Sequence, residues 1–319
     1  MVDILLSTYN GAKYLKDFIS SLMVQTFKDF RLIIRDDGSA DETPQILEDL
    51  KCKNSERVEI IKDNLGNLGP CKSFLFLLQR AESKYVMFAD QDDIWLPEKI
   101  EMTLRKMQEL ENKYGKETPL LVHTDLKVVD EKLKVLADSF WKYQGLNPRY
   151  KDLNYLIVQN NVTGCTVMIN QALKNLVKTI PERAIMHDWW LALVASAFGV
   201  IDYIPKLTIL YRQHQAQNTG ARPYSVKYFF KKFLINPEEA FKAVKKTLYQ
   251  AQDFLKMYEN LLTDAQKEIL LTYVKLPYFG TIDKIKKIWK WKLFKQGFLR
   301  NAGFILTLLL LRSEVHVTN

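Results

Sequence analysis

The sequence predicts an α/β fold in which a mostly parallel central sheet is flanked by helices. The first observation is a set of four short apolar runs, each of strand length, at Val2–Leu6, Leu32–Ile34, Val58–Ile61 and Tyr85–Ala89. The second is that a helical pattern separates each run from the next. The third is that a polar loop follows every run. Such alternation is typical of parallel strands joined by right-handed crossover connections.

The helices between these strands have individual signals. Leu15, Phe18 and Leu22 recur at helical spacing, which predicts an amphipathic helix after the first strand. Ser39 has capping-box spacing to the acidic residue three positions later, so a helix is expected from Ser39 to about Leu50. Further helices are expected after the third and fourth strands.

Composition limits the class of protein. The chain has 319 residues, of which 47% are hydrophobic, enough for one large or two smaller domains. Its formal net charge of +9 suits a phosphorylated ligand, anionic lipid or nucleic acid. Three scattered cysteines without metal-ligand spacing, and an N-terminus without a basic segment, predict a cytoplasmic protein with neither a disulfide framework nor a signal peptide.

Three carboxylates follow the fourth predicted strand, at Asp90, Asp92 and Asp93. Pro97, just beyond them, suits the first position of a helix. Carboxylates gathered at the end of a strand repel one another, and a divalent cation would relieve that repulsion. Oxygen ligands of this kind suit Mg²⁺ or Mn²⁺. The alternative is that Asp92 and Asp93 are solvated turn residues.

The loops after the other strands carry polar and aromatic side chains. If the connections are consecutive crossovers, these loops meet at one edge of the sheet. They would bring together a set able to contact a base, a ribose and a diphosphate: Thr8, Tyr9, Asn10, Asp37, Asn67, Lys72 and Asp90. The sequence contains neither a G-x-G-x-x-G motif after the first strand nor a P-loop, which argues against dinucleotide-binding and P-loop enzymes. The loops therefore predict a nucleotide-diphosphate pocket with a metal.

Three motifs together resemble the signature of family 2 glycosyltransferases, which have the Rossmann-like GT-A fold. Residues 7–11 read Ser-Thr-Tyr-Asn-Gly, residues 35–41 read Arg-Asp-Asp-Gly-Ser-Ala-Asp, and residues 90–93 read Asp-Gln-Asp-Asp. The resemblance implies inverting transfer of a sugar from a nucleotide diphosphate. It also implies that Tyr9 and Asp37 contact the base, that Asp90 lies near the ribose or metal, and that Asp92 is a metal ligand.

The Asp-Gln-Asp-Asp form is similar to that of bacterial rhamnosyltransferases. This resemblance implies dTDP-L-rhamnose as the donor and capsule or cell-wall polysaccharide synthesis as the setting. Thymine and uracil present the same imide edge, so UDP-hexoses stay open as donors. A saccharide acceptor, linked to a membrane lipid, is the expected partner.

The second chemical stretch is residues 187–190, His-Asp-Trp-Trp, at the start of a predicted helix. Glycosyl transfer needs a base for the proton of the attacking hydroxyl, and Asp188 suits that role. Its alternative role is to cap the helix. Trp189 and Trp190 suit stacking on an acceptor sugar, or else packing in the core.

Further candidates lie on either side of this stretch. Residues 161–169 are predicted to be β-rich, with Asn161 as an acceptor contact or a turn residue. Arg212, at the end of a strand expected over Leu207–Tyr211, is a candidate for the diphosphate or a surface residue. By resemblance His214 is a further metal ligand, although a lone histidine is often structural. Residues 215–222 suit a mobile lid.

The predicted domains are a GT-A domain over residues 1–222, with a nucleotide-sugar half (1–115) and an acceptor half (116–222), and a helical C-terminal region over 223–319. That region alternates lysines with aromatic residues, which suits an anionic membrane surface. Its apolar tract Gly303–Leu311 is too short to span a bilayer. We expect peripheral attachment to the inner face of the membrane, or else packing of the aromatic stripe on the catalytic domain.

Two other classes of function stay open on the sequence. A nucleotidyltransferase also gathers carboxylates around a nucleotide, but typically carries a Gly-rich basic loop after its first strand, and residues 7–10 are not of that kind. A non-catalytic basic protein would bind membrane or nucleic acid, but leaves the acidic loops unexplained. We therefore expect an enzyme without a nucleic-acid partner.

Overall fold

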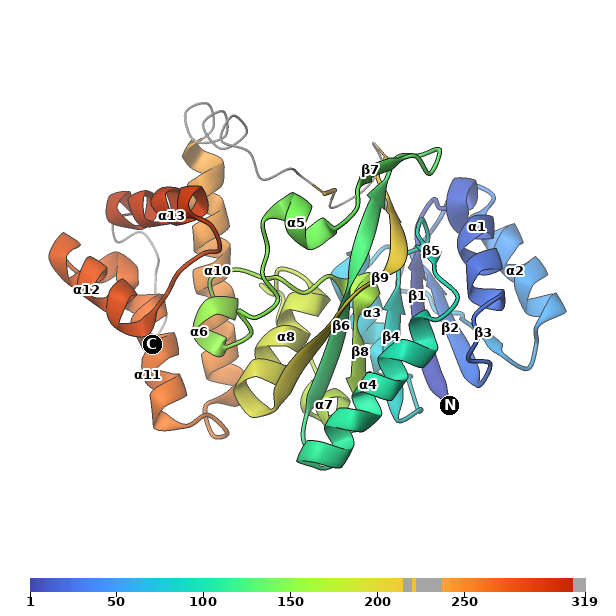
Figure 1. Cartoon of the computed structure of the whole chain (residues 1–319), viewed down its shortest axis with the longest axis horizontal. Helices are drawn as coiled ribbons and strands as arrows, with labels where there is room; N and C mark the ends of the chain where they lie inside the picture. The colour runs from blue at the N-terminus through green and yellow to red at the C-terminus, as the bar shows by residue number, and fades with distance from the viewer. Residues whose placement is uncertain (215–219, 222–236, 312–319) are drawn as a thin grey trace. The chain divides into compact units, whose positions relative to one another are not determined.

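A computed structural model describes residues 1–214, 220–221 and 237–311 (Figure 1). The chain divides into two compact units. The sheet unit consists of residues 1–141, 162–180 and 186–221, and the helical unit of residues 142–161, 181–185 and 222–319. The helical unit thus includes two segments that precede residue 222, where the sequence analysis drew a single boundary.

The first half of the sheet is parallel, as predicted. Its strands are β1 (Val2–Thr8), β2 (Phe30–Asp36), β3 (Val58–Ile61) and β4 (Tyr85–Ala89), in the order β3-β2-β1-β4. Most of the apolar side chains of β1, β2 and β4 are buried, as expected for central strands covered on both faces. The register pairs Thr8 with Asp36, so the polar loops after β1 and β2 begin side by side.

The second half of the sheet is mixed. It adds β8 (Met168–Asn170), β6 (Leu120–Val129), β9 (Val200–Arg212) and the two-residue β5 (Ile94–Trp95), with β7 (Val135–Ala137) paired to β6. Only β6 and β9 pair in parallel here; the other pairs are antiparallel. The expected mostly parallel arrangement therefore holds for the first half alone.

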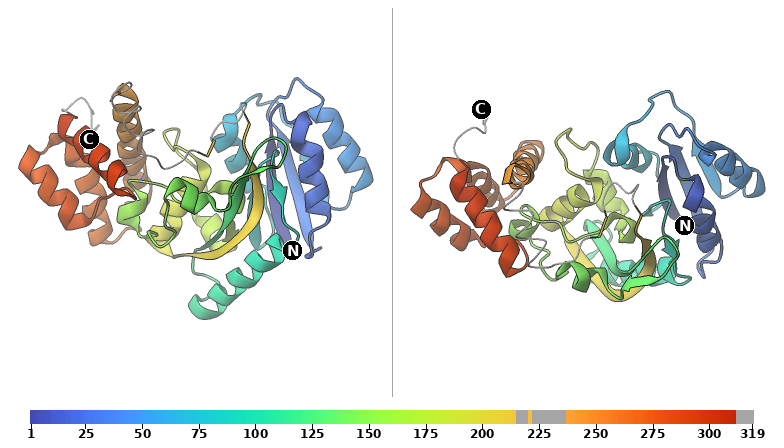
Figure 2. Two further views of the ribbon diagram at one scale, coloured as in Figure 1. Left: turned by 45° about the horizontal axis from the view of Figure 1, so that its top comes forward. Right: turned by 90° about the horizontal axis from the view of Figure 1, so that it is seen from above.

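Helices cover both faces of the sheet. Helices α3 (Gly69–Leu78) and α8 (His187–Phe198) pack together on one face, and α1 (Ala12–Met23) and α4 (Lys99–Tyr114) lie on the other (Figure 2). α2 (Thr43–Lys53) packs against α1 and β3, and the short α7 (Gln171–Leu176) follows β8.

Three local predictions were wrong. Helix α2 begins at Thr43 rather than at Ser39, because the Ser39 hydroxyl donates to Asp36 and does not cap the helix. Residues 161–169 form a 3₁₀ turn at Gly164–Thr166 and enter the sheet only at Met168. The fourth strand is followed by β5 before α4 begins at Lys99, so Pro97 lies in the turn ahead of the helix.

The helical unit contains α6 (Leu153–Leu156), α10 (Pro237–Tyr258), α11 (Asp264–Lys275), α12 (Thr281–Trp291) and α13 (Phe298–Leu310). α11 starts with a full capping box between Thr263 and Gln266. The core of the helical unit includes Phe254, Tyr273 and Phe304, and the buried Tyr273 hydroxyl is 2.7 Å from the Thr247 hydroxyl. No helix in the described part of the chain has the length and apolar content that a membrane span requires.

Candidate active site

The acidic loop after β4 meets a histidine from the other end of the sheet unit. His214, two residues beyond β9, places its Nε2 atom 2.7 Å from Oδ2 of Asp92. The imidazole also packs on the ring of Tyr14 in α1, with 4.8 Å between ring centroids. The structure thus brings together Asp92 and His214, both of which the sequence analysis singled out as metal ligands.

The other two carboxylates of the loop lie beside a buried thiol. One ligand atom from each of Asp90, Asp93 and Cys165 lies within 4.8 Å of the others. Desolvation and the charges of Asp92 and Asp188 raise the pKa of Asp90 to about 7. Desolvation and neighbouring carboxylates also hold the pKa of Asp93 well above its usual range. A cation here would offset this crowding of negative charge.

Asp93 is the most deeply placed carboxylate of the three, with no exposed surface. Its Oδ1 accepts a 3.3 Å hydrogen bond from the backbone N–H of Arg212, and its Oδ2 has no hydrogen-bond partner among the described residues. The Lys99 ammonium, also buried and without a hydrogen-bond partner in the described part of the chain, is the nearby counter-charge. Desolvation lowers the pKa of Lys99 to about 8, against the opposing influence of the charges of Cys165 and Asp93.

Sequence reasoning missed Lys99 and Cys165. Lys99 had a usable signal, because it occupies a position on the apolar face of α4 together with Thr103 and Met107, where a lysine is unusual. Cys165 had none, since its segment was expected to be an ordinary strand.

The loop after β1 is held by side chains from two other loops. The Thr8 hydroxyl donates to Asp36 at 2.8 Å, and the backbone N–H of Asn10 donates to Ser39 at 2.8 Å. Gln91 makes two 2.9 Å hydrogen bonds to the backbone of Tyr9, one to its N–H and one to its carbonyl. Tyr9 is 50% exposed, so its ring is accessible to a ligand. Gln91, which the sequence analysis passed over, therefore joins the loop after β1 to the acidic loop.

Asp37 is buried and organises the loop after β3. Its two carboxylate oxygens accept hydrogen bonds from the backbone N–H groups of Leu68 (2.7 Å) and Gly69 (2.8 Å), and it pairs with Arg35. Asn67 and Lys72 are exposed on this loop and at the start of α3. Contact of Asp37 with a base stays a prediction; the observed contacts make it a support of the loop that carries Asn67.

Asp188 lies in the first turn of α8, with its Oδ2 accepting a 2.9 Å hydrogen bond from the backbone N–H of Gly164. Its charge acts on the carboxyl of Asp90. Gly164 has little room for a side chain, because an added Cβ would lie 3.0 Å from Nε2 of His187. The candidate base and the acidic cluster therefore belong to one site, and Gly164 lets the backbone approach closely.

The neighbours of Asp188 differ in burial. His187 lies against the rings of Phe74 and Phe88, with centroids 4.2 Å and 5.2 Å away, and burial lowers its pKa to about 3. Trp190 is fully buried, a position that favours packing over the predicted acceptor contact. Trp189 is half-buried, so its predicted contact with the acceptor remains open to test.

Two further predicted residues have their polar groups engaged elsewhere. The Arg212 guanidinium donates to Asp17 (2.9 Å) and to the carbonyl of Glu131 (3.2 Å). Asn161 belongs to the helical unit, is 3% exposed, and donates from Nδ2 to two backbone carbonyls at 3.0 Å. Both roles stay predictions. The proposed lid, residues 215–222, lies outside the described residues except for residues 220–221.

Comparison with known proteins identifies the family. The model of glycosyl transferase family 2 matches residues 3–177. An uncharacterized glycosyltransferase of Rickettsia prowazekii is 26% identical over 227 residues, 69% of this chain and 66% of the relative. The dTDP-rhamnosyl transferase RfbG of Shigella flexneri is 25% identical over 236 residues, 70% of this chain and 76% of that protein. The chain thus spans just under two thirds of the Rickettsia relative.

Solved structures share the fold. The 1–349 fragment of S. aureus TarS in complex with UDP-GlcNAc has a TM-score of 0.55 and 17% identity, covering 97% of this chain and 89% of the fragment. The mannosyltransferase PcManGT of Pyrobaculum calidifontis, solved with GDP-Man and Mn²⁺, has a TM-score of 0.52 and 13% identity, covering 96% of this chain and 78% of the mannosyltransferase. With its strand-end acidic loop and its mixed α/β sheet, the chain belongs to glycosyl transferase family 2.

Proposed function

We propose that this protein transfers a sugar from a nucleotide diphosphate to a saccharide acceptor, with inversion at the anomeric carbon. The observation that carries the proposal is the convergence of Asp90, Asp92, His214 and Asp188 at the carboxyl ends of β4 and β9 and the start of α8. Ligands of open α/β sheets bind at that edge. Tyr9, with its exposed ring, follows β1, and the loop carrying Asn67 follows β3; these strands are the two parallel neighbours of β2, so both loops lie at the same edge of the sheet, which suits a nucleotide.

The proposed reaction is a single displacement. The oxygen of an acceptor hydroxyl attacks the anomeric carbon while the bond from that carbon to the diphosphate oxygen breaks, and its electron pair leaves with the diphosphate. The hydroxyl proton passes to a carboxylate oxygen of Asp188. The Gly164 N–H, 2.9 Å from Oδ2, orients this carboxylate.

The residues fit a divalent cation. Asp92 and His214 would hold it, with Asp90 and Asp93 as the further candidates; a mixed set of carboxylate and imidazole suits Mn²⁺ as well as Mg²⁺. A cation bound there would offset the negative charge that develops on the leaving diphosphate. The crowded carboxylates, whose pKa values are raised, support this assignment.

For the donor we propose dTDP-L-rhamnose. The Asp-Gln-Asp-Asp loop and the likeness to RfbG, named as a dTDP-rhamnosyl transferase, support it. The likeness to TarS, solved with UDP-GlcNAc, supports a UDP-hexose as the alternative. The two bases share the imide edge that a carboxylate or an amide recognises, so the sugar and not the base must separate the donors.

A donor screen tests the proposal. The full chain is incubated with dTDP-L-rhamnose, UDP-hexoses and GDP-mannose, with Mn²⁺ or with a chelator, and released nucleoside diphosphate is measured by mass spectrometry. We expect release from dTDP-L-rhamnose, dependent on the metal. If no nucleotide sugar is bound or cleaved, the transferase proposal fails; if only a UDP-hexose is cleaved, the donor assignment alone fails.

The proposal includes a lipid-linked acceptor and attachment of the protein to the cytoplasmic surface of a membrane. Two helices of the helical unit support it by exposing apolar side chains in a row. α12 exposes Ile282 (69%), Ile285 (39%) and Trp289 (66%). α13 exposes Phe298 (82%), and further along Leu306 and Leu310. Side chains of this size are usually buried, so such rows indicate an interaction surface.

Charge favours anionic lipid as the partner of these two helices. Between Thr281 and Leu311 the single acidic residue is Asp283. Lys284 is buried and donates to the carbonyls of Leu308 and Leu311, which leaves as the basic residues available to a partner Lys286, Lys287, Lys290, Lys292, Lys295 and Arg300. Lysines beside exposed tryptophan and isoleucine match the pattern of a helix that lies in the bilayer interface. The basic and aromatic residues predicted between 227 and 233 lie outside the described residues.

A further inference from the structure

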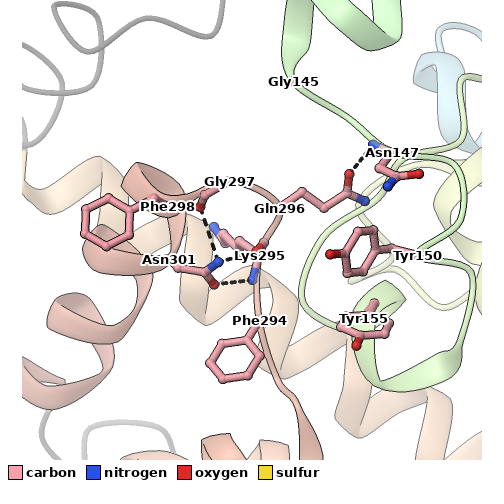
Figure 3. A pocket seen from close by; sticks show the side chains of 10 residues that line it. All are labelled: Gly145, Asn147, Tyr150, Tyr155, Phe294, Lys295, Gln296, Gly297, Phe298 and Asn301. Carbon is pink, nitrogen blue, oxygen red and sulfur yellow. Dashed lines mark hydrogen bonds between the residues drawn. The ribbon is translucent and has the colours of Figure 1, made fainter.

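The helical unit contains a pocket of its own, with a volume of about 440 Å³. It is formed by two segments far apart in the sequence (Figure 3). One is the segment after α5 (Phe140–Gln144), with Gly145, Asn147, Tyr150 and Tyr155; the other is the turn between α12 and α13, with Phe294–Phe298 and Asn301. None of these lining residues belongs to the active site described above.

Aromatic rings form two sides of this pocket. Tyr150 and Tyr155 are packed perpendicular to each other with 4.7 Å between centroids, and Phe294 lies across from them (Figure 3). Trp289 supports Phe294 from outside the pocket at 5.1 Å. Tyr150 is 37% exposed, so its ring is available to a ligand. The pocket therefore offers flat apolar surfaces at a fixed separation.

The backbone of the pocket is held rigidly by amide side chains. The side-chain oxygen of Gln296 accepts a 2.5 Å hydrogen bond from the backbone N–H of Asn147, and the backbone N–H of Gln296 donates to the side-chain oxygen of Gln159 at 2.8 Å. Asn301 bonds the backbone N–H and carbonyl of Lys295. These contacts join the two segments that form the pocket and fix the positions of its polar groups.

Several polar groups in the pocket are left for a ligand. Within the described residues, no hydrogen-bond partner is recorded for Nε2 of Gln296, Nδ2 of Asn147 or the hydroxyl of Tyr150. Gln296 is 6% exposed as a residue, but Nε2 is not one of the fully buried side-chain atoms that lack a partner, so this amide N–H₂ is accessible from the pocket. A ligand or water in the pocket can accept a hydrogen bond from it.

We propose that this pocket binds one sugar ring of a saccharide chain. The apolar C–H face of a pyranose would pack on the Tyr150 and Phe294 rings, and its hydroxyl oxygens would accept from the amides of Gln296 and Asn147. The inference rests on the proposed function in taking the acceptor to be a saccharide. It adds a second contact with the acceptor, outside the active site.

Other ligand classes fit the lining less well. Binding of a phosphate would favour two or more converging cations. The lining holds one basic residue, Lys295, and its ammonium lies over the Phe304 ring at 5.3 Å. A lipid tail would leave the amides of Gln296 and Asn147 unsatisfied. Aromatic faces next to unpaired amide donors remain, and this combination suits a neutral sugar.

The test is direct binding by the full chain. Fluorescently labelled protein is applied to a printed array of bacterial surface oligosaccharides, and the dissociation constant of the strongest binder is measured by calorimetry. We expect Tyr150→Ala to weaken that binding about tenfold, because it removes an aromatic contact surface. Tyr150→Phe keeps the ring and should have a smaller effect. Tyr278→Ala is the matched control, since Tyr278 is 42% exposed in the same unit but outside the pocket.

The outcomes separate the pocket from the proposed function. Loss of oligosaccharide binding in Tyr150→Ala, with wild-type binding in Tyr278→Ala and unchanged cleavage of the nucleotide sugar, supports the inference. Absence of oligosaccharide binding by the wild type, or equal binding by Tyr150→Ala, overturns it. If nucleotide-sugar cleavage continues in these samples, the proposed transferase function stands although the pocket inference is lost.

Discussion

Two regions of the molecule depart from the rule that apolar side chains are buried and ionisable ones exposed. The active-site edge of the sheet unit buries ionisable groups, and the α12–α13 surface of the helical unit exposes large apolar ones. In the sheet unit, Asp93 and Lys99 are ionisable groups without appreciable exposure. In the helical unit, Trp289 and Phe298 are large apolar groups that are mostly exposed. Both arrangements raise the free energy of the isolated folded chain.

This contrast suggests a different role for each unit. The buried carboxylates crowd one another, so a cation bound among them would lower their electrostatic energy. The exposed apolar rows are covered by no described part of the chain, so a partner surface would lower their free energy instead. In the function proposed above, the first region carries out the transfer and the second brings the chain to its partner.

The largest effect is expected from the first region, at the cation. Asp92→Asn removes a charged ligand beside His214, and because the cation would stabilise the leaving group by several kcal/mol, we expect transfer to fall on the order of 10⁴-fold. Binding of Mn²⁺, followed by electron paramagnetic resonance, should weaken in parallel. The control is Asp49→Asn, an exposed carboxylate on α2. Normal turnover by the wild type after thorough chelation would contradict the cation assignment.

The next effect concerns the base. Asp188→Asn keeps the size of the side chain and an oxygen that can accept from the Gly164 N–H, but it cannot accept a proton, so the transfer rate should drop on the order of 10²–10⁴-fold with little change in donor binding. Asp264→Asn changes the equivalent first-turn carboxylate of α11 and should leave the rate unchanged. Full activity of Asp188→Asn, or a product with retained anomeric configuration, would reject the mechanism.

The third effect is expected in membrane binding by the α12–α13 surface of the helical unit. Changing Lys286, Lys287 and Lys290 to Glu should weaken binding to vesicles of anionic lipid on the order of 10²-fold, since each lysine contributes about 1 kcal/mol near such a surface. Flotation at low and high salt measures it. The control changes Lys16, Lys53 and Lys84 of the sheet unit, all exposed, to Glu.

The apolar part of that surface has a separate test. Trp289→Ser should lower vesicle binding at every salt concentration, because it removes buried apolar area and not charge. If the wild type ignores anionic vesicles and sediments as a dimer that Trp289→Ser dissociates, the surface joins two copies of the chain and the membrane proposal is wrong.

The smallest effect is on stability and belongs to His187. Burial lowers its pKa to about 3 from the ordinary value of 6.5, so in the folded chain it stays neutral while the unfolded chain takes up a proton below pH 6.5. The stability associated with the neutral ring is complete above pH 6.5 and is lost as the pH falls toward 3. Between pH 7 and 5 this amounts to about 2 kcal/mol. His187→Leu should lose less stability over that range in urea unfolding; an identical loss in both proteins would exclude this role.

Local sequence pattern was sufficient for the first half of the fold. Nearly continuous apolar runs such as Val2–Leu6, interrupted by Asp3, are typical of strands covered by helices on both faces of a sheet. Strands that alternate with helices are then joined almost always by right-handed connections. The same logic located the carboxylates, because polar residues that directly follow parallel strands meet at one edge. Asp92 could therefore be proposed from the sequence, whereas Asp188 was proposed from its place at a predicted helix start and from the family resemblance. The proximity of Asp92 to His214 and of Asp188 to Asp90 is a property that the structure added.

Tertiary structure decided what depends on contacts between distant segments. The spacing of Ser39 predicts a helix cap, but its hydroxyl donates to Asp36. Trp190 was proposed to stack on an acceptor sugar, but in α8 it is buried in the core. Two features have no local signal: the burial of Cys165 behind the acidic loop, and the pocket in which Asn147 and Gln296 meet although 149 positions separate them. Lys99 had only an indirect signal, its position on the apolar face of α4. Propensity and spacing report on neighbours along the chain, whereas desolvation and hydrogen-bond satisfaction depend on the neighbours that folding brings into contact.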